Sequence, residues 1–187
     1  MDLLMNVLIG VGLAATCGFR VFVPFLVLGI AGLGGYLELG SGFQWIASYP
    51  SLIVFGVATL LEILAYFFPW VDNLLSTASV PISAIAGIML TAAVMTDVSP
   101  ILQWALAIIA GGGAATATSL VSTGIHHSST LVSAGAVNPV VSALESIGTV
   151  IVSILVIAAP ILAVIIIVLA YVVIRRTFLK VKHSLNF

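Results

Sequence analysis

Apolar stretches separated by short polar segments follow one another along the whole chain, and most are as long as a membrane-spanning helix. Because a helix needs about 20 residues to cross the hydrocarbon core of a bilayer, the stretches 51–68, 74–95 and 101–120 are each predicted to be one span. The stretch 147–174 is long enough to span with a tilt, and Pro160 is expected to bend it. The pattern predicts an all-α, polytopic helical bundle of about five to seven membrane segments.

The first apolar stretch, Leu3 to Leu33, is too long for one ordinary span and too short for two. Two interpretations stay open: one tilted span followed by a half-span, or a tight helical hairpin that breaks near Cys17 and Gly18. Both give a broken or re-entrant segment around Arg20. Irregular backbone within the hydrocarbon core of the membrane must be covered by protein or line a wet cavity.

Polar residues also mark the boundaries between spans and part of the second half of the chain. Residues 71–73 are predicted to form a short turn, in which Asp72 and Asn73 cap the following helix. The segment 116–133 becomes rich in Ser and Thr around His126. We therefore expect a second broken segment there, facing protein or a wet cavity.

Composition sharpens this picture, because 62% of the residues are hydrophobic and only 6% are charged. Soluble domains carry roughly 25% charged residues. A chain this poor in charge could not cover a water-facing surface, so the lipid bilayer is its expected solvent and 1–187 its single transmembrane domain. The formal net charge of −1 gives no reason to expect a nucleic-acid partner.

The basic residues are concentrated in the C-terminal tail. Four of the five Lys and Arg residues lie there: Arg175, Arg176, Lys180 and Lys182. By the positive-inside rule, the tail 175–187 is predicted to be cytoplasmic. The single cysteine, Cys17, excludes an internal disulfide and a Cys-rich metal site.

Two halves of the chain, 1–73 and 98–175, show the same order of features, which suggests an internal repeat. The segment 12–16 resembles 112–116. A titratable residue and then a helix with one acid follow in each half: Arg20 and Glu62 in the first, His126 and Glu145 in the second. Whether the halves would be inverted or parallel depends on how many crossings separate them. An inverted repeat would place the N-terminus outside, opposite the basic tail.

Arg20 is the most informative residue, because an unpaired charge at the centre of a span costs roughly 2.5–3.5 kcal/mol. Glu62 and Glu145 are candidate partners, and the three side chains are expected to converge near the midplane. A basic centre favours a small anionic or zwitterionic ligand, and two glutamates permit proton coupling. The alternative is a buried ion pair that only fixes helix register.

Further residues complete the predicted set of substrate- or ion-binding residues. Tyr66 shares a helical face with Glu62 and either contacts the same ligand or belongs to an aromatic belt. His126 is expected to contact an anion or a proton, or to lie at a wet boundary. Asn138 opens a helix containing Glu145, whose first N–H groups favour an anion or are simply capped. No nucleophile has an orienting acid, so we expect no enzyme activity. Neighbouring His126 and His127 do not share a helical face and no Cys cluster is present, so we expect no metal, and we expect no cofactor.

Several segments taken together resemble a bacterial membrane-protein family catalogued as domain of unknown function 4126. They are residues 18–24, 62–73, 110–113 and 138–142. The resemblance covers nearly the whole chain and implies a membrane fold in the bacterial cytoplasmic membrane, but no activity. That family commonly shows an arginine before a Ser-Thr pair where this chain has His126, which would make charge at that position depend on pH.

The sequence thus predicts a small transporter or channel, acting as a homo-oligomer, in which broken segments around Arg20 and His126 meet between the helices of Glu62 and Glu145. The alternative is a non-catalytic scaffold or accessory subunit whose buried charges set packing.

Overall fold

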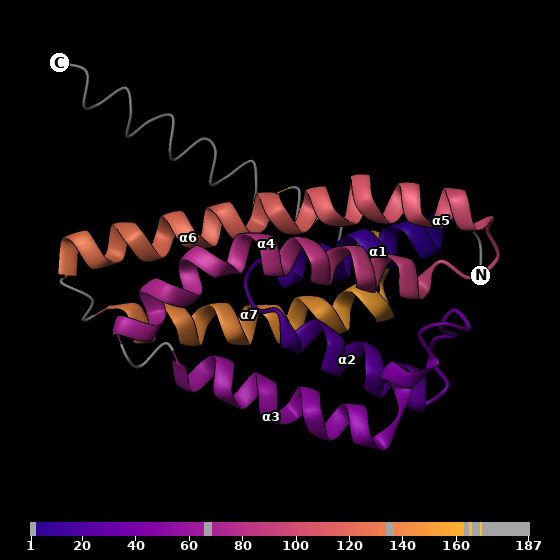
Figure 1. The fold of residues 1–187 in the computed structure, drawn as a ribbon, viewed down its shortest axis with the longest axis horizontal. Helices are drawn as coiled ribbons and strands as arrows, with labels where there is room; N and C mark the ends of the chain where they lie inside the picture. The colour runs from indigo at the N-terminus through magenta and orange to yellow at the C-terminus, as the bar shows by residue number, and fades with distance from the viewer. Residues whose placement is uncertain (1–2, 66–68, 134–136, 163–164, 166–168, 170–187) are drawn as a thin grey trace, which may run out of the picture.

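Helices make up the regular secondary structure of the part of the chain that the structure describes. This structure is a computed structural model, and it describes residues 3–65, 69–133, 137–162, 165 and 169. The helices are α1 (Leu3–Cys17), α2 (Phe22–Leu33), α3 (Tyr49–Ala65), α4 (Pro69–Val94), α5 (Pro100–Leu106), α6 (Gly113–Ser133) and α7 (Asn138–Ala158), as drawn in Figure 1. A 3-10 turn, Gln44–Ala47, precedes α3, and a π-helical stretch, Ala107–Gly112, joins α5 to α6.

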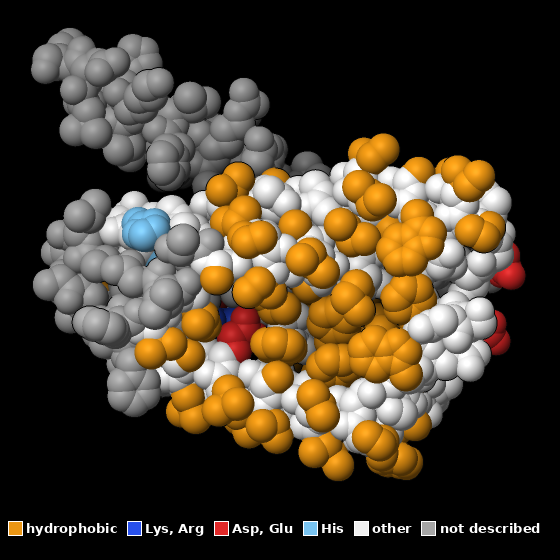
Figure 2. All heavy atoms as spheres, in the orientation of Figure 1, with side chains coloured by type: hydrophobic (Ala, Val, Ile, Leu, Met, Phe, Trp, Pro, Cys, Tyr) orange, Lys and Arg blue, Asp and Glu red, His pale blue; other side chains and the backbone are white. Residues whose placement is uncertain are grey.

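Two described helical runs are long and apolar enough to cross a membrane, namely Pro100–Ser129 and Pro139–Ala158. Within the most apolar 18 residues of each run, only 33% and 28% are buried, so most of this apolar surface faces outward. Hydrophobic side chains are likewise spread over the described part of the visible face (Figure 2). Shorter apolar helices make up α1, α2, α3 and the Ala78–Val94 part of α4.

The first apolar stretch forms a hairpin of two short helices. In Figure 1 the chain reverses direction between α1 and α2, and the turn lies about midway along the long axis. Helix α1 ends at Cys17 and α2 begins at Phe22, which agrees with the predicted hairpin rather than with one tilted span followed by a half-span. Gly18 is required in the turn, because a Cβ there would collide with Thr118 Oγ1 and lie 2.5 Å from the backbone nitrogen of Ser119.

Two prolines explain the outcome of two predictions: Pro69 corrects the predicted turn at 71–73, and Pro160 confirms the predicted bend. Residues 71–73 are not a turn, because α4 already begins at Pro69. Proline is well suited to the first helical position, where its fixed φ fits and its missing N–H is not needed. The bend expected at Pro160 is present: α7 ends at Ala158, Ala159 leaves the helix at φ −147°, and helical structure resumes at Pro160.

Helix α1 is the centre of the packing and contacts α4, α6 and α7. Small residues allow close approach at this point, since a Cβ on Gly87 of α4 would lie 2.6 Å from Ala115 Cβ on α6. The Thr91 hydroxyl of α4 also donates to the Gly10 carbonyl of α1 at 3.1 Å. These contacts hold the α1–α2 turn in the interior, next to α6 and α7.

The structure does not support the predicted internal repeat. Helices α1 and α6, which hold the similar segments 12–16 and 112–116, run in the same direction along the long axis (Figure 1). Helices α3 and α7, which hold the two acids, run in opposite directions. A single rotation does not relate both pairs, so the arrangement of these helices does not confirm the repeat, which stays a prediction.

Candidate functional site

A cluster of charged and hydroxyl side chains lies inside this apolar bundle, with Arg20 at its centre. Arg20 occupies the turn between α1 and α2 and is 0% exposed. Its Nε donates to Ser146 Oγ at 2.9 Å, and its Nη2 donates to the Ser142 carbonyl at 2.9 Å and also to the Ser142 hydroxyl. Both serines lie on one face of α7, since four residues separate them. The guanidinium is therefore bound by α7.

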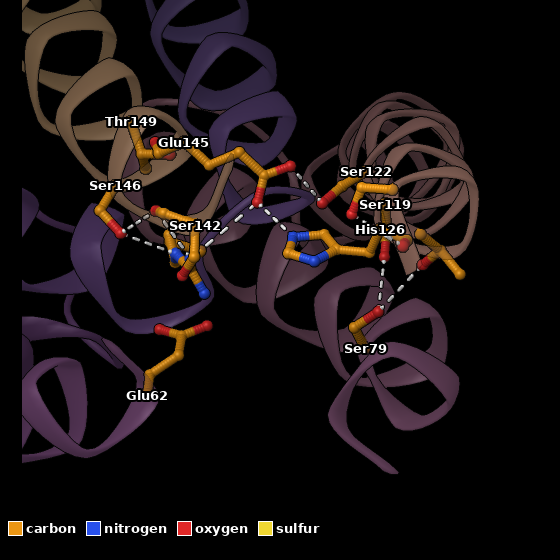
Figure 3. A network of polar contacts seen from close by, with 12 residues as sticks. Glu62, Ser79, Ser119, Ser122, His126, Ser142, Glu145, Ser146 and Thr149 are labelled. Atoms are coloured by element: carbon orange, nitrogen blue, oxygen red, sulfur yellow. Dashed lines mark hydrogen bonds and ion pairs between the residues drawn. The ribbon is translucent and has the colours of Figure 1, made fainter. Parts of the chain in front are cut away.

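Glu145 lies between the two basic side chains of the cluster. Its Oε2 is 4.0 Å from Arg20 Nη2 and 3.0 Å from His126 Nε2. Its Oε1 accepts a hydrogen bond from Ser122 Oγ at 2.7 Å. Figure 3 shows the carboxylate of Glu145 directed at His126 and Ser122, which project from α6. One carboxylate thus joins α6, α7 and the α1–α2 turn.

Glu62 reaches the same region from α3 but binds backbone. Its Oε1 accepts from the Val21 N–H at 2.8 Å, and its Oε2 accepts from the Phe22 N–H at 3.2 Å. These N–H groups stand at the start of α2, where the first donors of a helix have no partner within the helix. Glu62 therefore caps α2 from another helix, and its negative charge suits that end of the helix dipole.

Hydroxyl groups extend the cluster along α7 and α1. Ser142, Ser146, Thr149 and Ser153 are all buried, and they share one face of α7. At the far end of this row, Ser153 Oγ donates to Thr16 Oγ1 of α1 at 3.1 Å. Because hydroxyls both donate and accept, such a row can hydrogen-bond a polar guest or a water molecule.

The structure brings four of the six predicted site residues together: Arg20, Glu62, His126 and Glu145. Tyr66 lies outside the described residues. Asn138 is the first residue of α7, as expected, but its side chain also lies outside what the structure describes. The roles of all six residues in binding a ligand stay predictions.

The predicted broken segment around His126 is wrong, because α6 is continuous from Gly113 to Ser133. Several of its Ser and Thr hydroxyls bond back to carbonyls of the same helix. Examples are Thr118 to Ala114 at 3.0 Å and Ser128 to Gly124 at 2.8 Å. This back-bonding satisfies the hydroxyl groups without breaking the helix.

Sequence reasoning missed the serines that bind the charges: Ser122, Ser142 and Ser146. The signal was present in α7, where hydroxyl residues recur at intervals of four, three and four from 142 to 153. That spacing marks one helical face, and a polar face on an otherwise apolar helix indicates a polar partner. The partner, Arg20, is remote in sequence.

The chemistry available here is anion binding and proton exchange. Arg20 and the hydroxyls can bind an oxyanion, while Glu145 and His126 can each take or release a proton. Among the residues that the structure describes, no three His, Cys, Asp or Glu side chains are close enough to hold a metal ion.

These features define an all-helical protein with outward-facing apolar helices and a charged cluster in its interior. The chain belongs to the family described as domain of unknown function DUF4126, whose model matches residues 7–180. The resemblance seen in the sequence is therefore confirmed. No curated protein and no solved structure matches the chain.

Proposed function

We propose that this protein is a polytopic transporter of the bacterial cytoplasmic membrane for a small anionic or zwitterionic solute. Protonation of Glu145 releases it from Arg20, and the solute then binds to Arg20 in its place. The observation that carries the proposal is the position of the Glu145 carboxylate, 3.0 Å from His126 and 4.0 Å from Arg20. The carboxylate occupies the place that a solute anion would take.

Outward apolar surface supports the membrane assignment. Large side chains such as Ile101, Ile109 and Leu144 are 86%, 76% and 66% exposed, and lipid is the solvent that such surface favours. In a bilayer, the α1–α2 hairpin would be a re-entrant segment with its turn at mid-depth, where irregular backbone is tolerated only when protein covers it. Arg20 would then lie inside the membrane and would require compensation.

The charges of the cluster favour the uptake of one proton. Arg20 contributes +1 and Glu62 and Glu145 contribute −1 each, which leaves −1 when His126 is neutral. A net charge is costly in a low-dielectric interior, so a proton on His126 or on either glutamate brings the cluster to neutrality. When Glu145 itself is protonated, its attraction to Arg20 is lost and Arg20 can bind a solute anion.

The order of the helices also gives a topology. Helices α3, α4, the α5–α6 run and α7 alternate in direction along the long axis (Figure 1). If each crosses, and the apolar sequence 160–174 crosses after them, the basic tail lies opposite the N-terminal end. The positive-inside rule then puts the tail in the cytoplasm and the N-terminus outside. Labelling of cysteines introduced at Asp2 and Lys182 with an impermeant reagent tests this assignment. Homo-oligomeric assembly stays a prediction, which crosslinking in membranes would check.

A scaffold function is the second candidate, and one observation favours it. Arg20 is fully buried and its guanidinium contacts three residues of α7, as in a cluster that only fixes helix positions. A scaffold would co-purify with a fixed membrane partner and would move no solute.

The deciding experiment uses purified protein in liposomes, with labelled chloride, acetate, inorganic phosphate and glycine as probes. We expect uptake of at least one probe that depends on an imposed pH gradient. The variants E145Q, H126Q and R20K should each reduce this uptake about tenfold or more, a change of about 1.4 kcal/mol in barrier height. E38Q is the matched control, because it makes the same carboxylate-to-amide change at an exposed position. Absence of uptake for every probe, together with a co-purifying partner, would favour the scaffold.

A further inference from the structure

In the part of the chain that the structure describes, the exposed aromatic side chains all lie at one end of the bundle. They belong to the loop after α2, the 3-10 turn with the first residue of α3, and α5, which lie at the end of the long axis where α1 begins (Figure 1). Their exposed fractions lie between 46% and 80%. We call this group the aromatic band; its members are Tyr36, Trp45, Tyr49 and Trp104.

Ring contacts join the segments that carry the band. The ring of Trp104 in α5 lies 6.4 Å from the ring of Phe43 in the α2–α3 loop, measured between centroids. The ring of Trp45 lies 6.0 Å from that of Phe55 in α3. Each tryptophan is therefore packed against a phenylalanine and still about half exposed. Packing of this kind fixes the position of a ring while its N–H stays available to an outside acceptor.

The surface changes character on the two sides of the band. Glu38 in the loop and Asp97 before α5 are exposed, and Figure 2 shows acidic side chains at the edge of this end. Among the described residues, no Lys or Arg lies there. In the other direction, the exposed face of α3 continues from Tyr49 with aliphatic residues at intervals of three or four: Ile53, Val57, Leu60 and Leu64. Charged, aromatic and aliphatic residues follow one another in the order found across a membrane surface.

The distance from the aromatic band to the charged cluster is about half the thickness of a bilayer. Helix α2 begins directly after the turn that holds Arg20 and has 12 residues, and a helix of that length rises about 18 Å. The part of α3 between Tyr49 and Glu62 rises about 20 Å. Half of the hydrocarbon core measures about 15 Å, and a tilted helix gains less depth than its length. A band at the membrane surface thus puts both charges near the midplane.

We propose that the aromatic band lies in the headgroup layer of the bilayer and holds the charged cluster near the midplane. This inference rests on the membrane part of the proposed function and adds the surface that fixes the depth of the bundle. The partner is a layer of zwitterionic phospholipids, because the two exposed acids beside the band repel anionic headgroups. The O–H and N–H groups of the band can donate to phosphate and ester oxygens of such lipids.

The test measures tryptophan depth in liposomes of phosphatidylcholine that carries bromine at different depths of its acyl chains, because bromine quenches nearby tryptophan fluorescence. The chain has three tryptophans, so the full-length variant W70F keeps only those of the band. We expect bromine near the headgroup to quench W70F about twofold more strongly than bromine near the chain end. The control combines W45F, W70F and W104F with L61W, which puts one tryptophan at an exposed position of α3 next to Glu62. We expect the opposite order of quenching for this control.

The possible results separate this inference from the function on which it rests. Stronger quenching of W70F by deep bromine overturns the aromatic band. So does a lack of quenching of W70F while the L61W control is quenched, because water, a second copy of the chain or another protein then covers the band. The membrane assignment survives both results.

If neither variant is quenched, the band and the membrane assignment both fall. The expected order of quenching in a protein that moves none of the four solute probes supports the band and overturns transport. If the L61W control does not fold in detergent, W70F decides the question, because it leaves both tryptophans of the band unchanged.

Discussion

The carboxylates of Glu62 and Glu145 both lie inside the bundle but are bound in different ways. Glu62 is 9% exposed, and the side chain of Glu145 is 8% exposed. Glu62 accepts hydrogen bonds from two backbone N–H groups at the start of α2. Glu145 is bound by side chains from α6 and the α1–α2 turn. Backbone donors are fixed by the fold, whereas side-chain donors can rotate away.

This difference assigns a separate part to each acid. Glu62 fastens the turn that carries Arg20, and any movement of its carboxylate would leave helix donors without partners. Glu145 is held by side chains, and Arg20 has contacts with Ser142 and Ser146 that do not involve Glu145. Within the proposed function, Glu62 is a positioning residue and Glu145 is the exchanging group.

The largest expected effect comes from R20A, which removes the cation beside Glu145 and leaves a buried carboxylate uncompensated. Breaking a buried ion pair in this way costs about 3–5 kcal/mol. Thermal or denaturant unfolding in detergent measures the loss. R20K, which keeps the charge, should be affected less.

Double variants sharpen the comparison. Adding E145Q to R20A should recover part of the lost stability, because the uncompensated charge disappears. Adding E62Q to R20A should recover nothing, because Glu62 is bound by backbone N–H groups. Equal recovery by both second substitutions would show that the two acids are not distinct.

The next effect in size is expected for E62Q. The amide offers one acceptor oxygen in place of two, so either Val21 or Phe22 loses its hydrogen-bond partner. An unsatisfied buried donor costs about 1–3 kcal/mol. Hydrogen exchange at Val21 and Phe22 should accelerate while exchange in the middle of α6 stays unchanged. Unaltered exchange at both amides would contradict the capping role.

A smaller effect is expected for S122A, which removes one of the side chains that bind Glu145. His126 and Arg20 still contact the carboxylate, so the loss should be about 1–1.5 kcal/mol. Because several side chains bind Glu145, S122A and H126Q should each remove only part of this binding. A loss from S122A as large as that from R20A would argue against this division.

The smallest effect is expected for S153A, which lies outside the surroundings of both acids. Its hydroxyl donates to Thr16 Oγ1, and Thr16 in turn donates to the Leu13 carbonyl at 2.7 Å. Thr16 therefore keeps its own donor bond in the variant, and the loss should be about 0.5–1 kcal/mol. Unfolding experiments on this variant give the baseline for a buried hydroxyl pair that carries no charge.

Much of the helical pattern could be predicted from the lengths of the apolar stretches and from proline. The hairpin break at Cys17 and Gly18 and the bend before Pro160 both appear, because glycine and proline act on the local backbone. The predicted turn at 71–73 and the predicted break at His126 were wrong for a shared reason. Polar residues often mark helix ends, but here Pro69 starts α4 earlier and back-bonded hydroxyls keep α6 intact.

The gathering of Arg20, Glu145 and His126 was also foreseeable, since isolated charges in an apolar chain must find partners. Their exact partnership was not. The hydrogen bonds from Arg20 to Ser142 and Ser146 join residues 122 and 126 positions apart in the chain, and no local pattern encodes such pairs.

The sequence by itself determined that this chain folds into apolar helices and must neutralise a few charges in its interior, because both follow from composition and spacing. Only the tertiary structure decided which acid does what. The packing of α1 against α6 and α7 places Arg20 beside Glu145, and the approach of α3 to the start of α2 gives Glu62 its backbone partners. Two residues of the same type thus acquire different surroundings, because the packing of the helices, and not the residue type, decides whether backbone or side-chain groups bind a carboxylate.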